Sequence, residues 1–282
     1  MTTRPLKLGL TLLGQNSVPE MVEEAKQAEA AGFDVVLLPD HLGFTAPLVP
    51  LVAIAAATPS VQVSNLVLNA SFYSPALLAR DLAAVDSATG GRLIISLGTG
   101  YVEAEFDAAG IPFPSPGKRV KIVAETMSEI RRLLSDPGHM PPPVQTPPPI
   151  MVAAQGDKML SLAAEQADIV AIAAMGDDTH LADRLAFVKD KAGDRFDDIE
   201  LQFGFFQVSL DDPSDLSVIR MLEPDAPEEQ VRKLTTVLDV PPSAAAERIQ
   251  HLHQNLGISY FTLNKTAGTS WQSLEKLVTA VR

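Results

Sequence analysis

Asp40 and His41 are the neighbouring residues of this chain whose side chains are best suited to proton chemistry. They follow Pro39 at the end of a mostly apolar run, residues 33–38. Such a run predicts a strand buried on both faces, as in parallel sheets and barrels, where chemistry is placed at the carboxyl ends of strands. Because an imidazole titrates near neutral pH, the pair is a first candidate for a site. Alternatively, Asp40 caps the following turn and His41 is an ordinary polar residue.

Strand-like and helix-like runs alternate along the chain and would bring several strand ends together. The strand-like runs lie at residues 6–12, 33–38, 61–68, 93–97, 150–154, 169–173, 201–210 and 260–263. The helix-like runs lie at residues 18–31, 47–57, 75–88, 118–134, 158–167, 180–191, 228–256, with an interruption at Pro241 and Pro242, and 270–281. About eight strands, each followed by a helix, is the count of a closed (β/α)8 TIM barrel. The sequence therefore predicts an α/β fold, a single TIM-barrel domain over residues 1–282 with loop insertions.

An open doubly wound sheet is the alternative architecture. It would carry a glycine-rich turn after the first strand, whereas residues 13–16 contain no GxGxxG pattern. Residues 136–149 are dense in proline, and we interpret them as a surface excursion because the alternation resumes after them. The barrel is therefore the preferred architecture.

In a barrel, the carboxyl ends of all strands form one rim, and here that rim is expected to be rich in small, amide and hydroxyl residues. The expected rim residues are 11–16, 40–41, 68–71, 98–100, 154–156, 174–176, 209–211 and 264–266. Few of them are cations. This composition suits a large, flat, mostly neutral ligand held by close backbone approach and by shape.

Composition limits the classes of partner. The chain has 22 Lys and Arg against 35 Asp and Glu, a net charge of -13. Nucleic acid and membrane surfaces are therefore poor partners, and a small-molecule substrate is expected. The chain has no cysteine, which excludes disulfides and thiolate chemistry. No metal site is expected, because His251 and His253 lie two residues apart and face differently on a helix. Without a signal-like or long apolar segment, the chain is expected to be cytoplasmic.

A series of segments resembles the bacterial-luciferase-like flavin oxidoreductases, and in particular their deazaflavin branch, which uses coenzyme F420. The matching segments are residues 30–41, 66–75, 78–86, 91–100 and 149–168, with Glu105, Gly110, Arg119 and Glu125 between them. The series keeps the family's order and spacing over about the first 175 residues. The resemblance implies a TIM barrel that binds flavin or deazaflavin in a pocket at the rim.

The resemblance also implies roles for individual residues. Asp40 and His41 stand where the deazaflavin enzymes have an Asp-His pair beside the redox ring, so His41 becomes the candidate proton donor or acceptor and Asp40 its partner or a cofactor ligand. The other cofactor-binding residues implied are Asn65 and Leu66, near which the family often has a cis peptide bond behind the ring; Thr99 and Gly100, at the ring or its ribityl chain; and Gln155 and Gly156, at the phosphate. For that last pair, capping of the next helix by Asp157 is the alternative.

Residues on the substrate side are less distinctive. Lys265 follows the last strand, and it is a candidate to meet an anionic substrate or the acidic tail of the coenzyme, or else it is a solvated lysine. Asn16, on the rim after the first strand, is the other substrate candidate. The sugar-phosphate-oxidising members of the deazaflavin branch carry further basic residues that have no match here.

Three functions remain open. The leading prediction is an F420-dependent oxidoreductase that transfers a hydride to or from a small organic substrate. The second is a luciferase-like monooxygenase that uses FMN and oxygen, and the third is a non-catalytic flavin-binding protein. The alanine-rich helices at 47–57 and 75–88 have little polar surface, and dimers are usual in the family, so a homodimer is expected.

Overall fold

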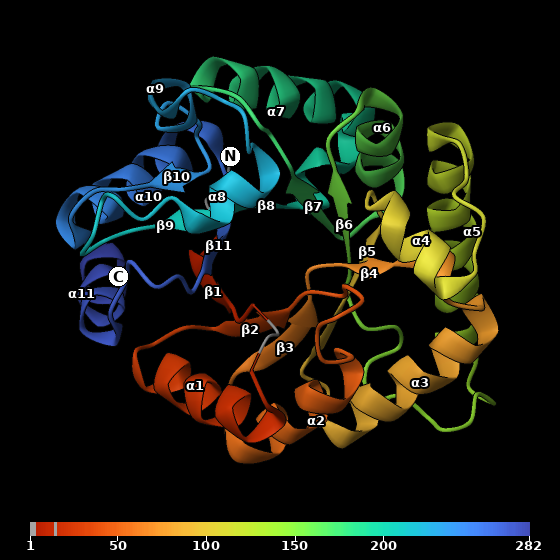
Figure 1. The fold of residues 1–282 in the computed structure, drawn as a ribbon. Helices are drawn as coiled ribbons and strands as arrows, with labels where there is room; N and C mark the ends of the chain where they lie inside the picture. Colours follow the sequence, from red (N-terminus) through yellow and green to blue (C-terminus); the bar gives the residue numbers. More distant parts are fainter. Residues whose placement is uncertain (1–3, 14–15) are drawn as a thin grey trace.

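The computed structural model describes residues 4–13 and 16–282, and its centre is a closed barrel of parallel strands (Figure 1). The strands of the barrel are β1 Lys7–Thr11, β2 Val35–Leu38, β3 Gln62–Asn65, β4 Leu68–Asn69, β5 Leu93–Gly98, β6 Ile150–Ala154, β7 Ile169–Ile172, β8 Glu200–Phe205 and β11 Tyr260–Asn264. Their order is β3-β2-β1-β11-β8-β7-β6-β5-β4, and pairing of β3 with β5 closes the ring. Because β3 and β4 share one position beside β5, the nine strands fill eight positions. The predicted TIM barrel is confirmed.

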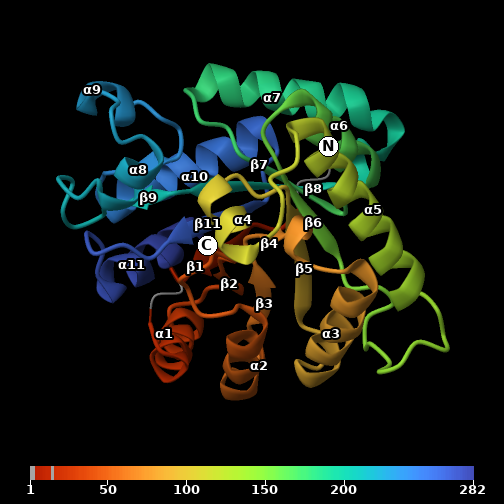
Figure 2. The same ribbon diagram turned by 45° about the vertical axis from the view of Figure 1, so that its right-hand side comes forward.

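Helices cover the outside of this barrel. They are α1 Val18–Ala30, α2 Leu48–Ala57, α3 Pro75–Ala88, α5 Pro116–Leu134, α6 Asp157–Gln166, α7 Asp178–Ala192, α10 Pro242–Leu256 and α11 Trp271–Val281. Each buries one apolar face, as α1 does with Met21, Ala25 and Ala28 at helical spacing. Figure 2 shows α3 and α5 side by side along the outer surface. No helix in the described part of the chain is long and apolar enough to cross a membrane.

Alternation along each strand divides the apolar side chains between two cores. In β2, Val36 and Leu38 belong to the large core between strands and helices, whereas Val35 and Leu37 belong to the smaller core inside the barrel. Successive side chains of a strand point to opposite faces, so a strand with both faces covered needs apolar residues at every position. This is why the runs that predicted strands are nearly continuous in apolar residues.

The third barrel position contains a bulge that the prediction of one strand at 61–68 did not include. Ser64 is in register with Ile94 and Leu68 with Leu97, so four residue steps on this strand oppose three on β5. One extra residue on one strand is the definition of a β-bulge. The peptide bond between Leu66 and Val67 is cis, which places the expected non-proline cis bond one residue further along.

The helix predicted at 228–256 is wrong in its first half. The structure has α9 Glu228–Val231, then strand β10 Val237–Leu238, and only then α10. β10 pairs in parallel with β9 Gln207–Val208, which follows β8 after a break, so the strand predicted at 201–210 is also divided. A separate apolar cluster causes this folding back: Leu216, Ile219, Val231 and Val237 pack together there. The helices α4 Glu103–Ala109 and α8 Ser217–Leu222 and the 3₁₀ turns Ala70–Phe72 and Gly193–Asp198 were not predicted.

The proline-dense residues 136–149 contain no helix or strand, as predicted, and Asp86 of α3 fixes the end of this segment. The Asp86 side chain is fully buried. It accepts hydrogen bonds from the backbone N–H groups of Val144, at 2.7 Å, and Gln145, at 2.8 Å, and from the Gln145 carboxamide at 2.8 Å. A buried carboxylate is tolerated here because donors surround it.

We expect Asp86→Ala to lower the free energy of unfolding by about 3 kcal/mol, because it leaves buried donors without an acceptor. Urea denaturation measures this change. Asp81→Ala is the matched control: it lies on the same helix with a side chain 46% exposed, and we expect a change within about 0.5 kcal/mol. Equal stability of the two variants would show that Asp86 does not hold the segment.

Candidate functional site

His41 lies just beyond β2 and is bonded to an acid from a different part of the barrel. Its Nδ1 is 2.7 Å from Oε1 of Glu105, which α4 carries after the end of β5. The side chains are 28% and 16% exposed, so the pair is partly shielded but reachable. An ionised carboxylate only accepts hydrogen bonds, so Nδ1 is the donor in this pair, and in a neutral imidazole Nε2 then carries the lone pair. The pair can therefore take up a proton at Nε2 while Glu105 holds the ring.

Asp40 belongs to a separate hydrogen-bond network. Within the described chain its side chain bonds to residues beyond the bulge and does not cap the following turn. Its Oδ2 accepts from the backbone N–H of Asn69 at 3.1 Å and from the Tyr73 hydroxyl at 2.9 Å, both beyond the bulge. Burial raises the pKa of Asp40, and these two hydrogen bonds oppose that shift. Burial and the charge of Asp40 also raise the pKa of Tyr73, so its phenol stays protonated and donates. Asp40 thus joins the end of β2 to the third barrel strand.

Aromatic rings flank His41. Phe44 lies 5.6 Å from the imidazole and Tyr101 5.8 Å, measured between ring centroids, and both are nearly perpendicular to it. Tyr101 is 65% exposed. A large exposed ring edge-on to a polar group provides an apolar contact surface beside it.

Gly98 and Gly100 bring the end of β5 against the bulge. A side chain on Gly98 would overlap Val67, and one on Gly100, which has a positive φ of 65°, would overlap Asn69. At position 100 only glycine can both adopt the positive φ and leave room for Asn69. Thr99 lies between them and is partly exposed. The predicted residues Thr99 and Gly100 therefore stand beside the bulge that contains Leu66.

Two of the expected cofactor-binding residues are more deeply placed. Leu66 packs against the apolar cluster inside the barrel. Asn65 is fully buried, and within the described chain neither polar atom of its side chain has a hydrogen-bond partner. Buried amides are normally hydrogen-bonded, so the Asn65 carboxamide can both donate to and accept from a ligand behind the bulge.

The expected phosphate position lies where β6 meets α6. Gln155 and Gly156 are exposed there, and a side chain on Gly156 would meet no atom within 4 Å. The alternative of capping by Asp157 is not what the structure shows, because Oδ1 of Asp157 accepts from Arg184 at 2.6 Å, and the helix start has no side-chain cap among the described residues. The first N–H groups of α6 are therefore open to an anion.

The two substrate candidates have local partners. Lys265 donates to the carbonyl oxygens of Thr269 at 3.0 Å and Thr266 at 3.3 Å, and its Nζ lies 5.7 Å from the Trp271 ring. Lys265 is thus not freely solvated, because its ammonium group bonds to these loop carbonyls and lies near the Trp271 ring. Asn16 is exposed and donates to Glu24 at 3.2 Å; its neighbours at 14 and 15 lie outside the described residues. Substrate binding by Asn16 or Lys265 stays a prediction.

The inside of the barrel mouth can accept a polar, planar group. Thr11, the last residue of β1, is in register with Leu37, whose side chain belongs to the interior cluster, so Thr11 also points inward. It is 4% exposed, and its hydroxyl has no hydrogen-bond partner in the described chain. Gly98 and Ala153 are small residues at neighbouring strand ends. A hydroxyl without a partner among the described residues, in a barrel mouth that also has small residues at other strand ends, fits a ligand that brings its own hydrogen-bonding atoms.

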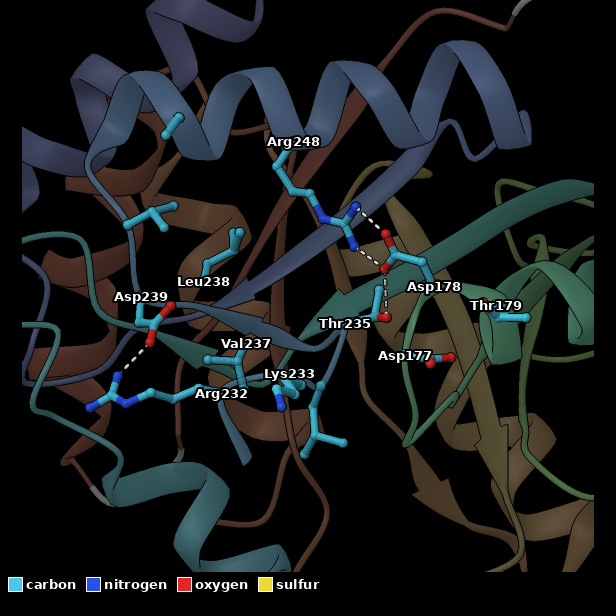
Figure 3. Close-up of a pocket in the computed structure, with 13 residues that line it drawn as sticks. Asp177, Asp178, Thr179, Arg232, Lys233, Thr235, Val237, Leu238, Asp239 and Arg248 are labelled. Atoms are coloured by element: carbon cyan, nitrogen blue, oxygen red, sulfur yellow. Dashed lines mark hydrogen bonds and ion pairs between the residues drawn. The ribbon is translucent and has the colours of Figure 1, made fainter. Parts of the chain in front are cut away.

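A second pocket, of about 640 Å³, lies away from His41, between α7, α10 and the segment around β10 (Figure 3). Its charged residues pair with each other: Arg248 bonds to Asp178, and Arg232 to Asp239. The Arg248 guanidinium lowers the pKa of Asp178. Arg248 thus joins α10 to α7, and Thr235 of the segment donates to the same Asp178 at 2.8 Å. None of the residues that line this pocket belongs to the described His41 network.

Comparison with known proteins agrees with this geometry. A family model described as luciferase-like monooxygenase matches residues 5–257. The chain belongs to this luciferase-like family. Its barrel superposes on the F420-dependent tetrahydromethanopterin reductase of Methanopyrus kandleri with a TM-score of 0.80, over 99% of both chains at 17% identity. That similarity concerns the fold.

Curated relatives of this luciferase-like chain include a reductase and an F420-dependent dehydrogenase. It is 28% identical over 184 residues to a 5,10-methylenetetrahydromethanopterin reductase of Archaeoglobus fulgidus, covering 59% of this chain and 53% of the relative. It is 34% identical over 143 residues to an F420-dependent glucose-6-phosphate dehydrogenase of Kineococcus radiotolerans, covering 47% and 42%. The chain thus spans about half the length of these relatives.

Sequence reasoning missed the residues that bond to the proposed pair. Glu105 belonged to the matching series and was expected either to line the pocket or to be a solvated loop acid, but α4 was not predicted, so its contact with His41 was not expected. Tyr73 and Asn69, the partners of Asp40, carried no signal beyond their place after a strand end. Contacts between different strand ends follow from barrel closure and have no local pattern.

Proposed function

We propose that this chain is an F420-dependent oxidoreductase that transfers a hydride between the deazaflavin and a small organic substrate, with His41 as the proton donor or acceptor. The observation that carries the proposal is the bond between His41 and Glu105 at the barrel rim. It leaves one imidazole nitrogen free and places a carboxylate on the other, an arrangement that stabilises the protonated ring. The F420-dependent relatives support the choice of coenzyme.

When bound, the deazaflavin supplies a two-electron hydride acceptor or donor. The residues that would hold it are those that the barrel brings to the rim: Leu66 in the bulge with Asn65 behind it, Thr99 and Gly100 beside it, Asp40 at the end of β2, and Gln155 and Gly156 at the start of α6. The open N–H groups of α6 suit a phosphate. The unpaired side chains of Asn65 and Thr11 suit a ligand with its own donors and acceptors.

The chain's own part in the reaction is to move one proton. Oxidation of an alcohol to a carbonyl removes a hydride from carbon and a proton from oxygen, and Nε2 of His41 takes that proton. Reduction of a carbonyl runs in reverse, and Nε2 returns the proton. Glu105 keeps Nδ1 protonated throughout and offsets the positive charge of the imidazolium. General acid–base catalysis of this kind contributes roughly 10²–10⁴ in rate.

Titration of the protein with coenzyme F420 and with FMN, followed by fluorescence, tests the coenzyme. We expect F420 to bind and FMN to bind much more weakly. The family description favours the alternative of an FMN-dependent monooxygenase. Tight FMN binding with oxygen consumption, and no binding of F420, would establish that alternative. Stoichiometric binding without any reaction that titrates with His41 would indicate a non-catalytic flavin-binding protein.

We also propose that the chain forms a homodimer through α2 and α3. α2 contains no charged residue, and Val49 on it is 68% exposed. Leu77 on the neighbouring helix α3 is 55% exposed. Exposed apolar side chains on adjacent helices favour a covering partner. Sedimentation of the protein at micromolar concentration measures the assembly, and a monomer there would contradict the proposal.

A further inference from the structure

The surroundings of His41 differ from those of a site for anionic substrates. Its ring is approached edge-on by Phe44 and Tyr101, and its Nδ1 is bonded to Glu105. Leu42, next along the chain, is 47% exposed. The groups in contact with the imidazole are thus two aromatic rings and a carboxylate, and an exposed apolar residue follows it in the chain.

The charge near His41 is negative. Asp40 and Glu105 both lie close enough to His41 to interact with it electrostatically, and the charge of Glu105 contributes to the raised pKa of Asp40. A phosphate or carboxylate brought next to these groups would be repelled by both carboxylates. A neutral hydroxyl or carbonyl oxygen meets no such penalty, and it can still exchange a hydrogen bond with Nε2.

Two cations near the rim are committed elsewhere. Lys265 donates to the carbonyl oxygens of Thr266 and Thr269. Arg119 lies 4.3 Å from the centroid of the Phe113 ring and donates to the carbonyl of Pro114 at 2.7 Å. Binding of an anion by Lys265, or by the Arg119 nitrogen that donates to Pro114, would cost these contacts. Among the described residues no lysine or arginine is bonded to His41, and its neighbours offer aromatic surface.

Resting on the proposed oxidoreductase function, we propose that the substrate at His41 is an uncharged alcohol or carbonyl compound with an apolar or aromatic body, and not a phosphorylated or carboxylated one. Tyr101 and Phe44 contact the body of the substrate, and Nε2 of His41 contacts its oxygen. Specificity arises from both sides, since the aromatic rings attract the neutral body and the two carboxylates exclude anions.

A matched pair of probes tests this inference. 1-Phenylethanol and 4-(1-hydroxyethyl)benzoate share the same reacting carbon and ring and differ by one carboxylate. Their binding is measured by saturation-transfer NMR, both with and without coenzyme F420, and glucose 6-phosphate serves as a phosphorylated probe. We expect the neutral alcohol to bind about tenfold more tightly than the benzoate, and glucose 6-phosphate to bind still more weakly. Equal or tighter binding of either anion, or no binding of 1-phenylethanol, would overturn the inference.

Variants separate the two causes of selectivity. Tyr101→Ala should weaken binding of 1-phenylethanol about fivefold while Tyr101→Phe retains it, because the ring and not the hydroxyl makes the contact. Glu105→Gln should reduce the tenfold difference between the two probes, because it removes one charge and keeps the shape. An unchanged ratio in Glu105→Gln and unchanged affinity in Tyr101→Ala would count against the inference. The proposed function fails separately, if F420 itself does not bind.

Discussion

Replacing His41 with Asn is expected to lower turnover with coenzyme F420 by about 10³, while the affinity for the coenzyme should change little. Asn preserves a polar side chain of similar reach but cannot take up a proton at neutral pH. The loss concerns the step in which the substrate oxygen gains or loses its proton, so it appears in kcat and in kcat/KM alike. Stopped-flow and steady-state measurements at saturating F420 record it.

His251→Asn is the matched control for this substitution. His251 is exposed on α10 and contacts Asn255 of the same helix, so the same chemical change there should leave turnover unaltered. Turnover of His41→Asn close to that of the unsubstituted protein would remove His41 from the mechanism. A parallel loss of F420 affinity would instead assign His41 to binding.

Glu105→Gln is expected to lower turnover by about 10², with a change in its pH dependence. Gln keeps the length of the side chain and an oxygen that can accept from Nδ1, so the position of the ring is retained. It removes the negative charge beside Nδ1, which in the proposed mechanism offsets the positive charge of the imidazolium. The pH profile of kcat/KM compares the variant with the unsubstituted protein.

Glu103→Gln controls for a general effect of charge on the same helix. Glu103 begins α4 two residues before Glu105 and is exposed, so its removal changes the net charge equally without touching His41. We expect an unaltered pH profile. Identical profiles for Glu105→Gln and the unsubstituted protein would show that the 2.7 Å contact has no catalytic consequence.

The barrel could be predicted because most of its strands are continuous apolar runs with turn residues at their ends. β6 has the predicted bounds of 150–154, and α3 those of 75–88. The region 207–241 could not be predicted in the same way. Its segments are short, and Val231 and Val237 are buried only because they meet Leu216 and Ile219 from elsewhere in the chain. Helical spacing at 228–240 was overridden by this packing.

The candidate site was predictable in its strand ends and not in its contacts. Asp40, His41 and Gly100 could be placed at the rim because each follows an apolar run. Asn69, a partner of Asp40, lies in the third barrel strand about 30 residues further along. Glu105, the partner of His41, lies on α4 after the fourth strand, about 60 residues further along. Both contacts depend on closure of the ring. Lys265 was considered as a ligand or a solvated cation, and its bonds to loop carbonyls could not be read from residue type.

The separate apolar cluster of Leu216, Ile219, Val231 and Val237 distinguishes residues 207–241 from the ends of β2 to β5. The two regions should differ in how far a substitution affects other residues. The ends of β2 to β5 are interlocked through Asp40, Glu105 and the glycines that meet the bulge, so an exchange of any one of them disturbs the others. Residues 207–241 owe part of their packing to this cluster, while Val208, Leu210 and Leu238 belong to the main core. Changes of length in the loops of this segment should therefore leave the interlocked strand ends in place.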